Sequence, residues 1–165
     1  MLIRYFGEIP TPFEAVEHAV LAAPETWMPR LARATERERE ALLSEVGVRD
    51  DGEHSKRPAE IRFGKALRLP AKTILPMRWK PSSAWPLFPE LEADFEVAAL
   101  GPSRTQLSVN ARYTPPLGRL GSIIDRALLH RVAEATVKDF VDRVRAELQR
   151  DTDGVPAAAS GSSAD

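Results

Sequence analysis

The chain has 165 residues, of which 43% are hydrophobic, and this is enough for one domain with a buried core. It contains no cysteine, which excludes disulfides and thiolate chemistry, and its three histidines lack the spacing of a metal site. The formal net charge of −1 lacks the positive excess that nucleic-acid phosphates require. No apolar run approaches the roughly 20 residues of a membrane-spanning helix, and residues 1–10 lack a signal-peptide pattern. We therefore expect a cytoplasmic protein with no metal, no cofactor, no nucleic-acid partner and no membrane span.

The first segments predict a strand followed by helices. Residues 2–9 alternate imperfectly between apolar and polar side chains, which predicts a strand. Apolar residues at helical spacing then predict a short helix that ends near Ala23. Pro29 is expected to interrupt the next helical segment, because proline lacks an N–H donor and clashes with the preceding turn.

Residues 35–40 have the sequence Thr-Glu-Arg-Glu-Arg-Glu. Thr35 and Glu38 have the spacing of a capping box, which predicts the start of a helix. The alternating charges are typical of a solvated helix face with local ion pairs, and we prefer this interpretation to a docking surface. Residues 41–49 fit either the end of this helix or a strand, and the sequence leaves both open.

A run of extended segments follows in the middle of the chain. Strands are predicted at residues 59–69, with a possible break at Gly64, and at residues 72–80, 91–100 and 104–113. The last of these has the clearest alternation in the chain. Alternation of this kind predicts an antiparallel sheet with one buried face and one solvent-exposed face.

The C-terminal part predicts one long helix and a tail. Residues 122–149 contain no proline or glycine, enough for a helix of roughly 40 Å. From Asp151 onward the chain is mostly Gly, Ser, Ala and Asp, which cannot offset the entropy lost on ordering. We therefore divide the chain into a domain at 1–150 and a disordered tail at 151–165.

The predicted terminal helix has two apolar stripes. The stripe expected to face the sheet consists of Ala133, Val137, Phe140, Val141, Val144 and Leu148. Followed toward the N-terminus, the same line reaches His130 and Arg126. A second stripe on nearly the opposite side consists of Ile124, Leu128, Val132 and Ala135.

Two segments carry a family resemblance. Residues 9–12 (Ile-Pro-Thr-Pro) lead to residues 24–27 (Pro-Glu-Thr-Trp), and residues 113–121 (Tyr-Thr-Pro-Pro-Leu-Gly-Arg-Leu-Gly) lead into residues 125–129 (Asp-Arg-Ala-Leu-Leu). With the order of elements, these segments resemble the START-like superfamily of polyketide cyclases, lipid-transfer domains and plant pathogenesis-related ligand binders. The resemblance implies an α+β helix-grip fold, in which a curved antiparallel sheet wraps a long C-terminal helix around an apolar pocket. The chain departs from the family in strand count, with five clear strands and one doubtful strand where seven are usual.

The candidate ligand-binding residues lie on the predicted helix, the strands and one connection. They are Phe63, Arg78, Trp79, Trp85, Phe95, Tyr113, Arg126 and His130. Trp85 belongs to a proline-rich connection that fits a lid over the pocket. Arg126 and His130 either reach the pocket and hold a ligand's carboxylate, carbonyl or phenol, or lie in water if the helix is rotated.

Three functions are compatible with this pattern, and the leading one is a carrier or sensor of a small apolar or aromatic molecule. The first alternative is an enzyme of the aromatase, cyclase or hydratase type in the same cavity. The second is a protein-interaction module that uses the exposed stripe of the terminal helix. A homodimer is compatible with that stripe.

Overall fold

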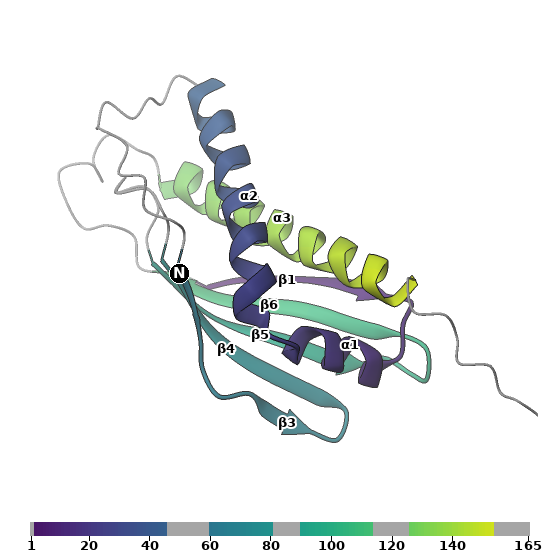
Figure 1. The fold of residues 1–165 in the computed structure, drawn as a ribbon. Helices are drawn as coiled ribbons and strands as arrows, with labels where there is room; N and C mark the ends of the chain where they lie inside the picture. The colour runs from purple at the N-terminus through teal and green to yellow at the C-terminus, as the bar shows by residue number, and fades with distance from the viewer. Residues whose placement is uncertain (1, 46–59, 81–89, 114–125, 154–165) are drawn as a thin grey trace, which may run out of the picture.

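The computed structural model describes residues 2–45, 60–80, 90–113 and 126–153, which form an α+β structure (Figure 1). In chain order the elements are β1 (Leu2–Ile9), α1 (Phe13–Leu21), α2 (Pro24–Glu45), β2 (Glu60–Phe63), β3 (Leu67–Leu69), β4 (Lys72–Lys80), β5 (Leu91–Ala99), β6 (Thr105–Tyr113) and α3 (Arg126–Asp153). Trp85 and the alternative strand at residues 46–49 lie outside the described residues.

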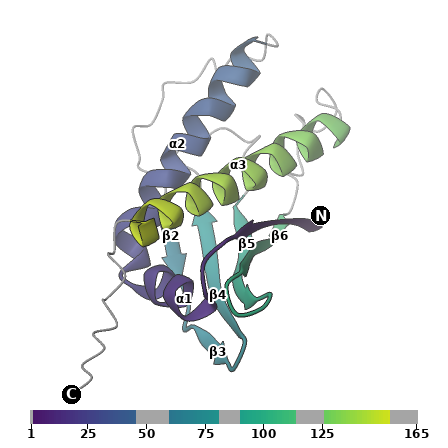
Figure 2. The ribbon, with the colours of Figure 1, turned by 90° about the vertical axis from the view of Figure 1, so that its right-hand side faces the viewer.

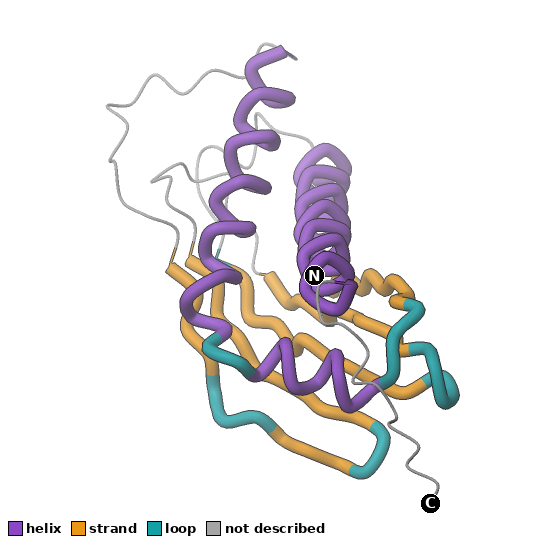
Figure 3. Tube along the Cα trace, turned by 45° about the vertical axis from the view of Figure 1, so that its right-hand side comes forward, coloured by secondary structure: helices purple, strands orange, loops and turns teal. Residues whose placement is uncertain are grey.

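The described strands form one antiparallel sheet with helices against one of its faces. The strand order is β1-β6-β5-β4-β2, and β3 pairs with the free part of β4. Because β1 and β2 end this order without pairing to each other, the sheet is not closed. Figure 2 and Figure 3 show α1, α2 and α3 on the same side of the sheet. The predicted α+β helix-grip architecture is confirmed.

The predicted break at Gly64 separates β2 from β3. The Gly64 amide donates a hydrogen bond of 2.8 Å to the carbonyl of Pro76 on β4. A Cβ atom at Gly64 would lie 3.2 Å from the Pro76 Cβ atom, so the two backbones approach closely here. Glycine therefore fits a point where one strand ends and the chain turns outward before pairing again.

The alternation predicted for residues 104–113 corresponds to the two faces of β6. The inward residues Thr105, Leu107, Val109, Ala111 and Tyr113 are all buried. They meet inward residues of β5 and β1 across the sheet, as in the pairs Phe95 with Val109 and Ile3 with Ala111. The core lies between this inner face and the three helices.

The helix α3 supplies the stripe that the sequence predicts. Val137, Phe140, Val141, Val144 and Leu148 are at most 2% exposed. The helix is described from Arg126 and continues through Asp153, beyond the predicted end at residue 149, because the first helix-breaking residues come later, at 154 and 156. None of the described helices is long and apolar enough to cross a membrane.

The expected interruption of α2 at Pro29 is wrong. The helix runs from Pro24 to Glu45 with Pro29 inside it, so residues 41–45 are helical. Met28, Leu31 and Ala32 are buried around the proline, and this packing outweighs the loss of one backbone hydrogen bond. For the same reason no helix starts at residue 35, and the capping-box prediction is also wrong.

A buried carboxylate ties α1 to the sheet. Glu17 on α1 accepts hydrogen bonds from Arg68 Nε at 2.9 Å and Arg68 Nη2 at 2.7 Å, and Thr73 Oγ1 also donates to it. The hydrogen bond from Arg68, together with that from Thr73, lowers the pKa of Glu17 against the opposing effect of burial. Glu17 is therefore ionised in the folded protein at neutral pH.

We predict that this carboxylate makes the fold sensitive to acid. Because the pKa of Glu17 is lower in the folded state than in the unfolded state, it stabilises the fold above the unfolded value of about 4.3, and this contribution is lost as the pH falls through the folded pKa. Glu17→Gln should lower the free energy of unfolding by about 1–3 kcal/mol at pH 7. Urea unfolding of both proteins at pH 7 and near pH 3 measures the difference. A difference that does not shrink at the lower pH would contradict the prediction.

Candidate functional site

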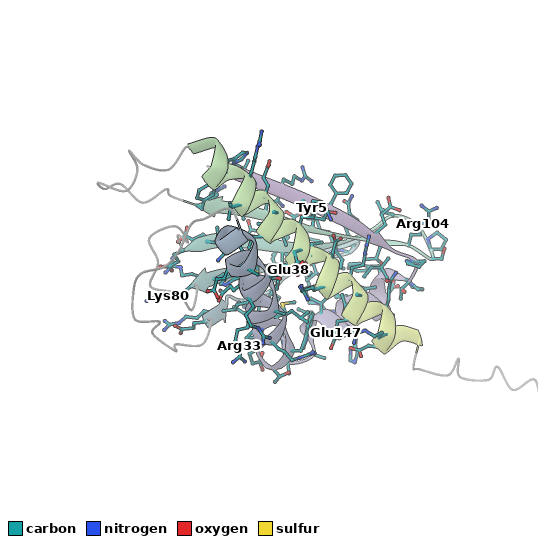
Figure 4. All side chains as sticks on the ribbon, turned by 90° about the horizontal axis from the view of Figure 1, so that it is seen from above. Tyr5, Arg33, Glu38, Lys80, Arg104 and Glu147 are labelled. Carbon is teal, nitrogen blue, oxygen red and sulfur yellow. The ribbon has the colours of Figure 1, made fainter. Side chains whose placement is uncertain are left out.

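The helices α2 and α3 run antiparallel along a seam of polar contacts. The contacts are Arg30 with Glu147, Thr35 Oγ1 with Asp139 Oδ2 at 2.7 Å, and Arg143 with Glu38. Figure 4 looks down on the two helices and shows Glu38 where they lie side by side. The two helices are therefore joined along this seam by exposed and half-exposed charges.

The inward stripe of α2 changes character along its length. Its first part is apolar, with Met28 and Ala32 fully buried. Its continuation is polar, because Thr35, Glu36 and Arg39 are only 1%, 2% and 9% exposed. Charged side chains are seldom buried to this extent unless they are paired or used. The buried polar part of the stripe thus indicates a candidate site.

These residues contact α3 and the sheet. Trp79 Nε1 on β4 donates to Glu36 Oε1 at 2.7 Å, and Arg39 Nη1 donates to Thr136 Oγ1 at 3.0 Å. The Thr136 hydroxyl in turn donates to the carbonyl of Val132 at 2.7 Å. We call Glu36, Arg39, Trp79 and Thr136 the buried polar cluster.

Burial disfavours the charged form of Arg39 in this cluster. Burial lowers the pKa of Arg39 to about 10, and the carboxylates of Glu36 and Glu40 oppose this effect. Arg39 still carries its proton at neutral pH. A guanidinium is therefore held inside the protein next to the buried carboxylate of Glu36, at the border of the apolar core.

The interpretation of residues 35–40 as a solvated face is wrong for Thr35, Glu36 and Arg39. A signal for their burial was present in the sequence, because these positions continue the helical spacing of Met28 and Ala32. The alternating charges of residues 35–40 favoured a solvated face instead. Arg37 and Glu38 are exposed, as the interpretation requires.

The cluster lies against the last row of the sheet's inner face. In this row Ile61, Trp79, Leu91 and Tyr113 are neighbours on β2, β4, β5 and β6. All four are at most 8% exposed. Figure 4 marks this end of the sheet by Lys80 and the opposite end by Arg104. Trp79 also packs on Phe140 of α3, with ring centroids 5.3 Å apart.

Glu134 contacts His130 and acts electrostatically on Tyr113. His130 Nε2 lies 3.2 Å from Glu134 Oε1, one turn further along α3. Burial raises the pKa of the Tyr113 phenol, and the charge of Glu134 raises it further, so the phenol keeps its proton. The structure thus brings together Trp79, Tyr113 and the His130–Glu134 pair around one end of the core.

The other predicted site residues divide between the two faces. Phe95 is fully buried on the inner face, and Phe63 is half-buried in the neighbouring row. Arg78 lies on the outer face, where its exposed guanidinium pairs with Glu90 and Glu92. The structure does not bring it to Trp79, its neighbour in the chain.

The N-terminal part of α3 is described only in its backbone. Arg126 is the first residue of α3, and its side chain lies outside the described set. Of the second stripe, Val132 is half-buried and Ala135 is exposed, while Ile124 precedes the helix as described and the Leu128 side chain is not described. The proposed roles of Arg126 and of this stripe therefore stay predictions.

A separate depression lies on the outer face of the sheet. It has a volume of about 420 Å³ and is bordered by Arg62, Arg78, Glu92, Asp94, Asn110 and Arg112. Its charges largely pair along the surface, as in Arg62 with Glu60 and Arg78 with Glu92. The described side chains include no group of three or more histidine, aspartate and glutamate residues that could hold a metal ion.

Comparisons with known proteins bear on the fold alone. No family model and no curated protein matches the chain. Similar solved structures include the Zhui aromatase/cyclase of a Streptomyces species, with 14% identity, a TM-score of 0.45 and coverage of 98% of this chain and 99% of that one. A conserved protein from Geobacillus kaustophilus has 13% identity, a TM-score of 0.44 and coverage of 89% and 94%. A protein from Thermus thermophilus has 13% identity, a TM-score of 0.43 and coverage of 92% and 99%.

Proposed function

We propose that the protein binds a small, largely apolar molecule between the sheet and α3, at the end of the sheet where β4 and β6 finish. The observation that carries this proposal is the change of the inward stripe of α2 from apolar to polar beside Trp79. Buried opposite charges such as Glu36 and Arg39, which interact electrostatically, add little stability compared with apolar side chains of similar volume. Their position beside an apolar row therefore supports a role in binding more than a role in folding.

The composition of this region suits a ligand with an apolar body and a polar end. Trp79, Leu91 and Tyr113 supply the apolar wall. Arg39 stays charged at neutral pH and supplies forked N–H donors at the border of that wall. Small-molecule sites combine apolar walls with a few fixed polar groups in this way.

The seam between α2 and α3 provides a route of entry. Trp79 and Tyr113 are covered in the structure, so a ligand that reaches them must part the elements above them. Contacts such as Arg143 with Glu38 are partly exposed and can be exchanged for water at low cost.

We predict that a larger side chain on the inward stripe of α3 near His130 blocks binding. Ala133 is half-buried on the inward stripe of α3, one turn from His130 and from Val137. Ala133→Phe should lower the affinity for N-phenyl-1-naphthylamine, an apolar fluorophore, by about tenfold or more, which corresponds to about 1.4 kcal/mol. The measurement is a fluorescence titration, with displacement by fatty or aromatic competitors.

The matched control is Ala135→Phe, which adds the same ring to an exposed position of the same helix. It should leave the affinity unchanged. Equal affinities in the wild type and both variants, or a fluorophore that no small apolar competitor displaces, would contradict the proposed site.

Enzyme activity in the same space is the second candidate. The observation that favours it is the contact of His130 with Glu134, because a carboxylate that orients an imidazole is a common arrangement for acid–base chemistry. A binder returns its ligand unchanged, whereas an enzyme converts it. Chromatography of a ligand before and after incubation with the protein distinguishes the two.

A further inference from the structure

The two ring nitrogens of His130 have different surroundings. Nε2 lies 3.2 Å from a carboxylate oxygen of Glu134, on the part of the ring that reaches solvent. Nδ1 is shut off from solvent and has no hydrogen-bond partner among the described residues. About a third of the side chain is exposed, so the imidazole spans the boundary between solvent and the protein interior.

This environment selects one tautomer of the imidazole. A lone pair on Nε2 would face the negative oxygen of Glu134, so Nε2 carries the hydrogen and donates it. In this tautomer Nδ1 is an acceptor on the buried side of the ring.

We infer that the bound molecule carries a hydroxyl group, of the phenol, enol or alcohol class, that donates a hydrogen bond to His130 Nδ1. This inference rests on the proposed function, because it concerns the polar end of the same ligand. The donor complements an acceptor that the described residues leave unused. The Tyr113 phenol, which stays protonated beside Glu134, places a second polar group on the same side of the core.

The test compares 1-naphthol with 1-methoxynaphthalene, which has the same ring system and an oxygen without a hydrogen. Calorimetric titration of the wild type should give an affinity about tenfold higher for the naphthol. His130→Phe keeps a ring at this position but removes the acceptor, so the two affinities should become equal. His130→Asn should restore part of the preference, because its amide oxygen can accept near the position of Nδ1.

The control is His18→Phe, which makes the same substitution at an exposed position of α1 and should keep the preference. Equal binding of both probes to the wild type, or a preference that survives in His130→Phe, would overturn the inference and leave the proposed function intact. Binding of neither probe would overturn both. Unfolding curves recorded for each variant establish that the comparison is made between folded proteins.

Discussion

Trp79→Ala is expected to lower the free energy of unfolding by about 3–5 kcal/mol. The indole is 2% exposed and packs on Phe140, so its removal opens a cavity between β4 and α3. The substitution also removes the donor to Glu36, which leaves a buried carboxylate oxygen without the indole N–H. Urea unfolding followed by circular dichroism measures the loss.

Trp79→Phe separates these two causes. It retains an aromatic ring against Phe140 and removes only the hydrogen bond to Glu36 and part of the packing, so a smaller loss of about 1–3 kcal/mol is expected. Arg78→Ala, at the next position on the outer face, should change stability by less than about 0.5 kcal/mol. A loss below about 1 kcal/mol for Trp79→Ala would show that this end of the core is loosely packed.

Arg39→Met is the second substitution with a large expected effect, a loss of about 3–5 kcal/mol. Methionine has a similar length and an apolar character, but it leaves the carboxylate of Glu36 buried without the neighbouring positive charge. The cost arises from that carboxylate and not from a gap in packing. The same unfolding measurement at pH 7 checks it.

The double variant Glu36→Gln, Arg39→Met should recover most of this loss. Glutamine is neutral and its oxygen can still accept the hydrogen bond from Trp79 Nε1. If the pair serves binding more than folding, the double variant should be as stable as the wild type while its affinity for N-phenyl-1-naphthylamine changes. A double variant as unstable as Arg39→Met alone would indicate that the guanidinium itself holds α2 against α3.

The strands were predictable because their pattern depends directly on which face is buried. In β6 the alternation of Leu107, Val109 and Ala111 with polar residues follows the two faces of the sheet without reference to any distant residue. The same reasoning separates Arg78 from Trp79, since adjacent strand residues point to opposite faces. The prediction that Arg78 and Trp79 line the same pocket conflicts with this alternation.

The course of α2 and the buried polar cluster depended on distant contacts. Pro29 carries a local penalty in any helix, and only the burial of its neighbours Met28 and Ala32 against the core outweighs it. Glu36 and Arg39 look locally like members of a solvated face. The helical spacing from Met28 and Ala32 indicates that they face inward, but their hydrogen-bond partners Trp79 and Thr136 lie 43 and 97 residues away in the chain, so the local pattern does not identify them.

A crystal structure of the protein with 1-naphthol tests most directly whether the ligand binds on the inner side of the sheet. We expect the naphthalene ring beside Trp79 and Tyr113, with its hydroxyl group within hydrogen-bonding distance of His130 Nδ1. A naphthol molecule in the outer depression bordered by Arg112, or no bound molecule at a saturating concentration, would contradict the proposed site.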